Sequence, residues 1–325
     1  MSTYKVSIIV PNYNYASYLE ARINSILNQT FQNFELILLD DASTDNSAEI
    51  LYRYRNNPHV THIEINKSNT GSPFQQWFKG ISLAQGEYIW IAESDDLCEL
   101  EFLTTTIEVL DRHPNASVCF TGSILIDENG DTLPYDINKW GKKEKEKEYA
   151  LYNGKIYAAH NLYWRNYIAN ASAALFRKSS FEQITLHKCI EMRYSGDWLF
   201  WFKLIMQGDI IEIYKIQNYF RQHLKKVTVK ADYNGEGKKE DIEIIRQMES
   251  ALPTIGCYKR IIRHGILYNS IHKLPASNQI KENLYTLLKQ QLNATSIDGC
   301  IAHLNHLLRF ICPFIINMKR DRLHP

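Results

Sequence analysis

The sequence lacks paired cysteines, a long apolar run near its start and an excess of charge of either sign. Its 6 cysteines are scattered and form no C-x-x-C pair, which argues against a zinc site and against a disulfide framework. The apolar run before Pro11 is too short for a signal peptide or a membrane span. We therefore expect a protein of the reducing cytoplasm.

The charge balance argues against one class of partner. The chain carries 37 Lys and Arg residues against 36 Asp and Glu residues, a net charge of +1. Proteins that bind nucleic acid usually carry a clear basic excess, so we expect no nucleic-acid partner. The 45% hydrophobic and 22% charged content of these 325 residues is typical of a globular protein with a full core.

Strand-like and helix-like patterns alternate through the first hundred residues. Four strands are predicted, at residues 6–10, 34–41, 60–65 and 87–96. The segments between them repeat apolar residues at helical spacing, as in Leu19, Ile23 and Ile26. Strands that alternate with helices indicate an α/β fold with a Rossmann-like, mostly parallel sheet flanked by helices.

The pattern then becomes less regular. Residues 99–113 predict a further helix. Residues 117–127, followed by the turn-like residues 127–131, predict antiparallel strands joined by a hairpin. The mixed-charge run at residues 141–149 predicts a solvated loop or helix face.

Polar clusters follow three of the predicted strands, at residues 11–14, 40–45 and 93–96. The carboxyl ends of parallel strands share one edge of a sheet, so these clusters are expected to line one rim. An acidic cluster with no Cys or His beside it suits Mg²⁺ or Mn²⁺, and Mg²⁺ usually shares phosphate oxygens with a substrate. This favours a nucleoside diphosphate ligand. The alternative is that Asp95 and Asp96 cap the next helix.

Three segments together resemble a known family: residues 6–47, residues 66–71 ("NKSNTG") and residues 84–96 ("AQGEYIWIAESDD"). They are similar to the family 2 inverting glycosyltransferases of GT-A fold. The resemblance covers residues 4–225 and is strongest up to residue 105. It implies a GT-A catalytic domain over residues 1–225, with a nucleotide-sugar half at 1–97 and an acceptor half at 98–225.

The resemblance assigns roles in binding the nucleotide. It implies that Pro11 and Tyr13 lie against the base, with the Tyr13 ring as a stacking face and Asn12 between them in the donor site. Asp41 would accept a hydrogen bond from the base N–H. Uridine is therefore the expected base, and the expected donor is a UDP-sugar.

The resemblance also implies a metal site. Asp95 matches the metal-binding acid of the DxD motif and would hold Mg²⁺ or Mn²⁺ against the diphosphate. Glu93 stands where the family more often has Asp, within reach of the ribose or a metal-bound water, and Ser94 lies between the two acids. Arg221 and His223 resemble a later R-x-H element, so His223 is a second metal ligand, with Arg221 near the diphosphate. The alternative for His223 is a surface histidine that follows a strand.

An inverting transfer needs a base, because the acceptor hydroxyl loses its proton as it attacks the anomeric carbon. Asp197 resembles the acid that the family places before a tryptophan, although Gly196 replaces the first acid of that pair. The alternative for Asp197 is a plain helix N-cap.

These assignments predict the transfer of one sugar at a time to a hydroxyl of a glycan or lipid-linked acceptor, in surface polysaccharide synthesis. The chain has no Q-x-x-R-W motif of processive synthases and no G-x-G-x-x-G loop of dinucleotide-binding enzymes. The alternative is a GT-A-fold glycan- or nucleotide-binding protein, or a partner subunit, with weak catalysis. Glu93 and Gly196 keep that alternative open.

The C-terminal region predicts only helices from about residue 240 onward, so we place a domain boundary near residue 225 and a helical region over 226–325. The tail at residues 304–325 combines apolar residues with Arg309, Lys319, Arg320 and Arg322. Such a tail suits peripheral contact with the inner face of a membrane. The alternative is a terminal helix that packs on the catalytic domain.

Overall fold

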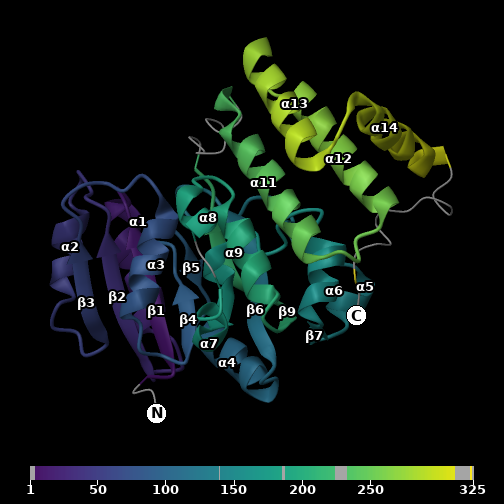
Figure 1. The fold of residues 1–325 in the computed structure, drawn as a ribbon. Coiled ribbons are helices and arrows are strands. Elements are labelled where there is room, and N and C mark those ends of the chain that lie inside the picture. Colours follow the sequence, from purple (N-terminus) through teal and green to yellow (C-terminus); the bar gives the residue numbers. More distant parts are fainter. Residues whose placement is uncertain (1–3, 139, 185–186, 224–232, 312–322, 324–325) are drawn as a thin grey trace.

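The computed structural model describes residues 4–138, 140–184, 187–223, 233–311 and 323. Within them lies a nine-stranded sheet with the order β3-β2-β1-β4-β8-β6-β9-β5, and β7 pairs with β9 (Figure 1). Four parallel strands form one half of the sheet: β1 (Val6–Asn12), β2 (Phe34–Asp40), β3 (Val60–Ile65) and β4 (Tyr88–Ile91). This confirms the predicted α/β architecture.

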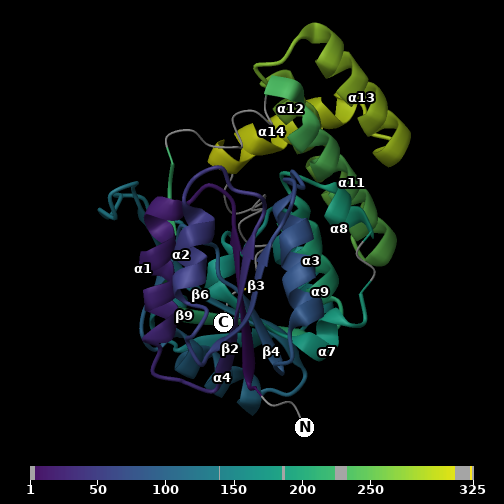
Figure 2. The same cartoon turned by 90° about the vertical axis from the view of Figure 1, so that its left-hand side faces the viewer.

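Both faces of this half are buried because apolar residues follow one another along each strand. Ile8 and Val10 pack on one face and Ile9 on the other. Helices α1 (Ala16–Leu27) and α2 (Ser47–Arg53) cover the first face, and α3 (Pro73–Leu83) covers the second (Figure 2). The polar residues that follow β1, β2 and β4 are left at one edge.

The other half of the sheet is mixed. β5 (Leu97–Cys98), α4 (Phe102–Arg112) and β6 (Ala116–Ile126) lead to β7 (Tyr149–Tyr152), β8 (Ala174–Arg177) and β9 (Asp209–Arg221). β6 pairs antiparallel with β8 and parallel with β9. The predicted hairpin at 127–131 is present only as a short one: Ile126 and Thr132 form a single antiparallel bridge, and Leu133 N–H donates to the Leu125 carbonyl (2.8 Å). The main partners of β6 are β8 and β9.

The helix-cap alternative for the acidic cluster was wrong. Asp95 and Asp96 precede the short strand β5, and α4 begins only at Phe102, with Glu101 at its N-cap. The mixed-charge run forms one short helix, α5 (Lys142–Lys145), ahead of β7.

Short helices join the later strands. They are α6 (Gly154–Tyr157), η1 (Ala158–Leu162), η2 (Ala171–Ala173), α7 (Lys178–Phe181) and α8 (His187–Glu191). The longer helix α9 (Gly196–Ile205) then packs on the same face of the sheet as α3. Its aromatic residues Phe200 and Trp201 contact Trp77 of α3, which brings the N-terminus of α9 close to the strand ends.

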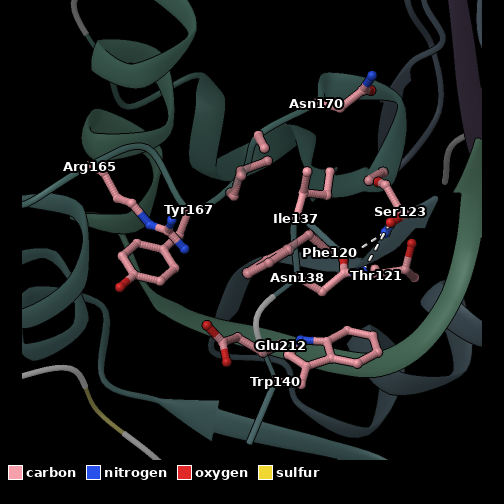
Figure 3. Close-up of a pocket in the computed structure, with 14 residues that line it drawn as sticks. Phe120, Thr121, Ser123, Ile137, Asn138, Trp140, Arg165, Tyr167, Asn170 and Glu212 are labelled. Carbon is pink, nitrogen blue, oxygen red and sulfur yellow. Dashed lines mark hydrogen bonds between the residues drawn. The ribbon is translucent and has the colours of Figure 1, made fainter. Parts of the chain in front are cut away.

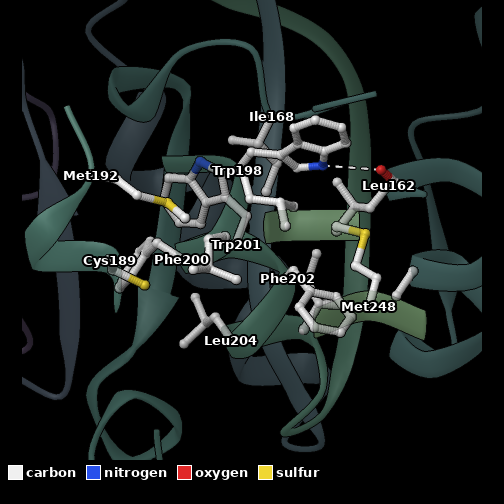
Figure 4. Packing of buried hydrophobic residues seen from close by; sticks show 14 of the residues in the cluster. Leu162, Ile168, Cys189, Met192, Trp198, Phe200, Trp201, Phe202, Leu204 and Met248 are labelled. Atoms are coloured by element: carbon white, nitrogen blue, oxygen red, sulfur yellow. Dashed lines mark hydrogen bonds between the residues drawn. The ribbon is translucent and has the colours of Figure 1, made fainter. Parts of the chain in front are cut away.

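The C-terminal region is helical, as predicted. It contains α11 (Glu236–Ala251), α12 (Cys257–His272), α13 (Asn278–Leu292) and α14 (Ser296–Ile311). Met248 of α11 lies beside Phe202 of α9 in one apolar cluster, so this region shares a core with the sheet (Figure 4). The predicted boundary near residue 225 lies outside the described residues.

The tail is described only in part. Arg309 lies in α14, which packs against α12, whereas Lys319, Arg320 and Arg322 lie outside the described residues. Among the residues that are described, no helix has the length and apolar character needed to cross a membrane.

We predict that Gly265→Ala weakens the packing of α12 on α14. A Cβ at Gly265 would lie 2.6 Å from the Cβ of Ala302 and against the backbone of Asp298. Overpacking of this kind costs about 1–3 kcal/mol, which thermal and urea unfolding would measure. Gly256→Ala is the matched control, because nothing lies within 4 Å of its Cβ position, and should cost under about 1 kcal/mol. Equal stability of the two variants would contradict the described packing.

Candidate active site

One pocket at the carboxyl ends of β1, β2 and β4 brings together most of the predicted site residues. Eight of them line it: Pro11, Asn12, Tyr13, Asp41, Glu93, Ser94, Asp95 and Asp197. The space between its walls, open solvent included, is about 1560 Å³. The three strand-end clusters thus meet at one rim, and α9 adds Asp197 from the other half of the sheet.

Two consecutive acids at the end of β2 have different surroundings. Asp40 is fully buried and accepts hydrogen bonds from Asn12 Nδ2 (2.7 Å) and Ser43 Oγ (2.6 Å), so it holds the first two loops together. Asp41 lines the pocket, and its carboxylate accepts from Asn66 Nδ2 (2.7 Å), Thr70 Oγ1 (2.8 Å) and Gln76 Nε2 (2.8 Å). These donors fix the orientation of Asp41.

Two buried acceptors beside Asp41 have no partner. Asn12 Oδ1 and Gln76 Oε1 are enclosed atoms without a hydrogen bond, and both residues line the pocket. A ligand with N–H groups at this place would satisfy them. The sequence reasoning missed Gln76. Its signal was a polar residue on the apolar face of α3, between Phe74 and Trp77.

The acidic cluster after β4 is crowded with negative charge. Glu93 accepts a hydrogen bond from Trp77 Nε1 (2.8 Å), and burial, followed by the charges of Asp95 and Asp96, raises the pKa of Glu93 to about 8. Asp95 Oδ2 lies 2.8 Å from His223 Nε2, and the His223 ring stacks on Tyr15. The hydrogen bond with Asp95 raises the pKa of His223.

The donor set fits a magnesium-like ion. No group of three or more metal-binding side chains occurs in the described part of the chain, so Asp95 and His223 form a pair. Mg²⁺ is typically held by one or two protein ligands together with substrate phosphates and water, and Mn²⁺ accepts both oxygen and imidazole donors. A site that the protein completes only with a diphosphate is consistent with these residues.

Asp96 also lines the pocket, and Arg221 at the end of β9 is bonded to it. The buried Asp96 carboxylate accepts from Asn170 Nδ2 (2.8 Å), Ser172 Oγ (2.7 Å) and the backbone N–H of Arg221 (2.9 Å). Arg221 Nε donates to the Asp95 carbonyl oxygen (2.7 Å), and its Nη1 donates to the carbonyl of Asp127. Arg221 is not among the residues that line the pocket, and its Nε and Nη1 donate to backbone carbonyls, so its predicted place near the diphosphate stays a prediction.

Asp197 lies in the first turn of α9, where it accepts a hydrogen bond from Asn166 Nδ2 (2.8 Å). Burial raises its pKa to about 6. The neighbouring Gly196 has a packing explanation, because a Cβ there would lie 2.5 Å from Cε2 of Phe74. Phe74 occupies the space that a side chain at position 196 would need.

The loop before Asp197 is held by the C-terminal region. Glu240 of α11 accepts backbone hydrogen bonds from Arg193 (2.8 Å), Tyr194 (2.9 Å) and Ser195 (2.6 Å). Arg193 and Tyr194 line the pocket, and Arg193 is the cationic residue among the described residues that do so. No sequence motif pointed to this contact.

Comparison with known proteins identifies relatives of the sheet domain. The family model described as Glycosyl transferase family 2 matches residues 7–185. Glycosyltransferase GlyG of Streptococcus pneumoniae serotype 4 is 41% identical over 100 residues, which cover 31% of this chain and 33% of that protein. The putative teichuronic acid biosynthesis glycosyltransferase TuaG of Bacillus subtilis is 31% identical over 128 residues, 39% of this chain and 50% of that one.

A further relative has known structures. The poly(ribitol-phosphate) beta-N-acetylglucosaminyltransferase TarS of Staphylococcus aureus is 26% identical over 220 residues, which cover 66% of this chain and 35% of that protein. The crystal structure of its residues 1–349 with UDP-GlcNAc matches with a TM-score of 0.56 at 18% identity, over 91% of this chain and 74% of that one. This similarity shows a common fold. The chain spans between a third and a half of the length of these curated relatives.

We predict that Glu240→Ala releases the loop before Asp197. Three backbone N–H groups lose their acceptor, so hydrogen exchange at Arg193, Tyr194 and Ser195 should become about tenfold faster or more. Glu236→Ala, on the same helix and half-exposed, is the matched control. Unchanged protection of these amides in Glu240→Ala would show that the contact does not hold the loop.

Proposed function

Because the chain belongs to glycosyl transferase family 2, we propose that it transfers one sugar from a UDP-sugar to a hydroxyl of a glycan or lipid-linked acceptor, with inversion at the anomeric carbon. One observation carries the proposal. A single pocket is lined by Asp41, by Asp95 with His223 beside it, and by the half-buried acid Asp197. Asp41 would bind the nucleotide base, Asp95 and His223 would hold the metal at the diphosphate, and Asp197 would accept the proton of the attacking hydroxyl.

The uridine assignment is supported at the Asp41 end of the pocket. Uracil offers an N–H donor, and Asp41, Asn12 and Gln76 present acceptors there, two of them unpartnered. Tyr13 is 44% exposed and provides a ring face for stacking. The TarS structure with UDP-GlcNAc supplies a precedent for such a donor on this fold.

The diphosphate would lie at the acidic end of the pocket. Asp95 and His223 would hold Mg²⁺ or Mn²⁺, which offsets the negative charge of the departing nucleotide when bound. Arg193 adds a positive charge to the same pocket wall. The chain's own acids would otherwise repel the diphosphate, so we propose that the reaction depends on the metal.

Asp197 is proposed as the base. Asn166 holds one carboxylate oxygen, which orients the group toward the pocket it lines. With a pKa of about 6, the carboxylate is ionised at neutral pH and still basic enough to take the proton of the attacking hydroxyl. The displacement is direct, and no sugar becomes attached to the protein.

A weakly catalytic binding protein is the second candidate, and the geometry favours it less. The two departures from the family pattern are accommodated by neighbours: Glu93 is bonded by Trp77, and Gly196 makes room for Phe74. Both departures are thus explained by packing, and Asp41, Asp95 and Asp197 are all present in the pocket.

The acceptor class and place of action also form part of the proposal. TuaG, a relative, is named for teichuronic acid biosynthesis, and we propose that this chain acts in the synthesis of a surface polysaccharide. Helix α14 exposes Ile297, Leu304 and Ile311 to solvent and carries Arg309 near its end. We propose that the protein acts in the cytoplasm and contacts the inner face of the membrane through this C-terminal segment.

We predict that the protein releases UDP from one member of a UDP-sugar panel, and does so only with Mg²⁺ or Mn²⁺. Asp197→Asn should lower the rate about 10²–10⁴-fold while leaving UDP binding in place, because only the proton acceptor is lost. Asp95→Ala should lose the metal dependence together with the activity. Asp131→Asn, an exposed turn residue, is the control. Turnover by Asp197→Asn at the wild-type rate would exclude this base.

The pH dependence follows from the same residue. A base works in its ionised form, so kcat/KM should rise with pH through about 6 and then level off. The rise should be absent from the residual activity of Asp197→Asn. A rate profile of the wild type that stays flat between about pH 5 and about pH 8 would contradict the role of Asp197.

A further inference from the structure

A second pocket adjoins the active site, and we propose that it binds a neutral pyranose ring of the acceptor. It is walled by Thr121, Asn138, Trp140, Arg165 and Tyr167 (Figure 3). The inference that this ring belongs to the acceptor rests on the proposed transferase function. The inference that the ligand is a neutral sugar rests on the residues of the pocket alone.

The location suits an acceptor. Ala169 and Asn170 line both this pocket and the active-site pocket, so the two share a wall. Asn166, which lies between Arg165 and Tyr167 in the chain, donates the hydrogen bond that orients Asp197. A ring bound here would therefore hold its hydroxyl groups close to the proposed base.

Two polar atoms in the walls lack a partner. Thr121 is 3% exposed and its Oγ1 has no hydrogen bond, and neither does the buried Nε of Arg165. Buried polar atoms are normally satisfied, so unpaired ones that line a pocket indicate a ligand. A sugar hydroxyl both donates and accepts, and so it can serve a threonine hydroxyl and an arginine N–H alike.

Aromatic rings supply the remaining surface. Trp140 is held over Gly122, where a Cβ would lie 2.7 Å from Cζ2 of the indole, and its ring meets Tyr214 edge to face. Asn138 anchors the same segment through two hydrogen bonds with the backbone of Ser123 (2.8 and 2.9 Å). Ring faces beside hydrogen-bonding groups are the surface that an amphipathic sugar ring fits.

The charge in the pocket favours a neutral ligand. The guanidinium of Arg165 lies 4.4 Å from the centre of the Tyr167 ring, and the buried carboxylate of Glu212 lines the opposite side. A lone cation would select a phosphate or a carboxylate, but the carboxylate of Glu212 in the same pocket repels either.

The test is direct binding of sugars in the absence of nucleotide. Saturation-transfer NMR is recorded with a panel of methyl α- and β-pyranosides of glucose, galactose, mannose, N-acetylglucosamine and N-acetylgalactosamine. The wild type should bind at least one member. Trp140→Ala should weaken that binding about tenfold, and Thr121→Val about fivefold, because each removes one part of the ring's surroundings.

One matched comparison makes the test specific. Tyr135→Ala, in the same segment, 69% exposed and outside the pocket, should bind as the wild type does. Loss of the signal in Tyr135→Ala, or its survival in both pocket variants, would overturn the proposal.

The outcome separates this inference from the proposed function. Sugar binding that depends on Trp140, in a protein that turns over no UDP-sugar, would support the pocket and refute the transferase. Turnover of a UDP-sugar by a wild type that binds no member of the panel would overturn the pocket alone.

Discussion

The active site depends on one buried carboxylate, that of Asp96. It joins the end of β4 to Asn170 and Ser172 ahead of β8 and to the backbone of Arg221 at the end of β9. The parallel half of the sheet, which carries the nucleotide-binding loops, is thereby tied to the half that carries the base. Arg221 Nε also donates to the carbonyl oxygen of Asp95, so the backbone of the proposed metal ligand is bonded to the end of β9.

This arrangement concentrates negative charge, and the protein offsets it only in part. Arg22 is fully buried with its guanidinium 4.9 Å from the ring centre of Trp90, and its charge opposes the raised pKa of Glu93 and of Asp96. His223 adds a second partner at the rim. Burial and the charges of Asp95 and Asp96 still raise the pKa of Glu93 to about 8, so this carboxyl is largely protonated at neutral pH and relieves part of the repulsion.

The sequence predicted what is local and missed what is assembled from distant segments. The first four strands and their helices follow from short apolar periods, and the clusters with Asp41 and Asp95 follow from where those strands end. The hairpin at 127–131 is reduced to one antiparallel bridge, and the main partner of β6 is β9, which is distant in the sequence. Gln76 and Glu240 had no motif, because each acts through a contact that is distant in the sequence. Gln76 bonds Asp41, 35 residues before it, and Glu240 bonds the backbone of Ser195, 45 residues before it.

The central claim is that three strand ends form a binding site for a uridine diphosphate, and calorimetric titration with UDP tests it most directly. With Mn²⁺ present, the account predicts saturable binding of one UDP per chain that is weakened when the metal is removed with EDTA and exceeds the binding of CDP or GDP. A titration that shows no binding of UDP with or without the metal would contradict it, and the acids at the end of β4 would then need another explanation.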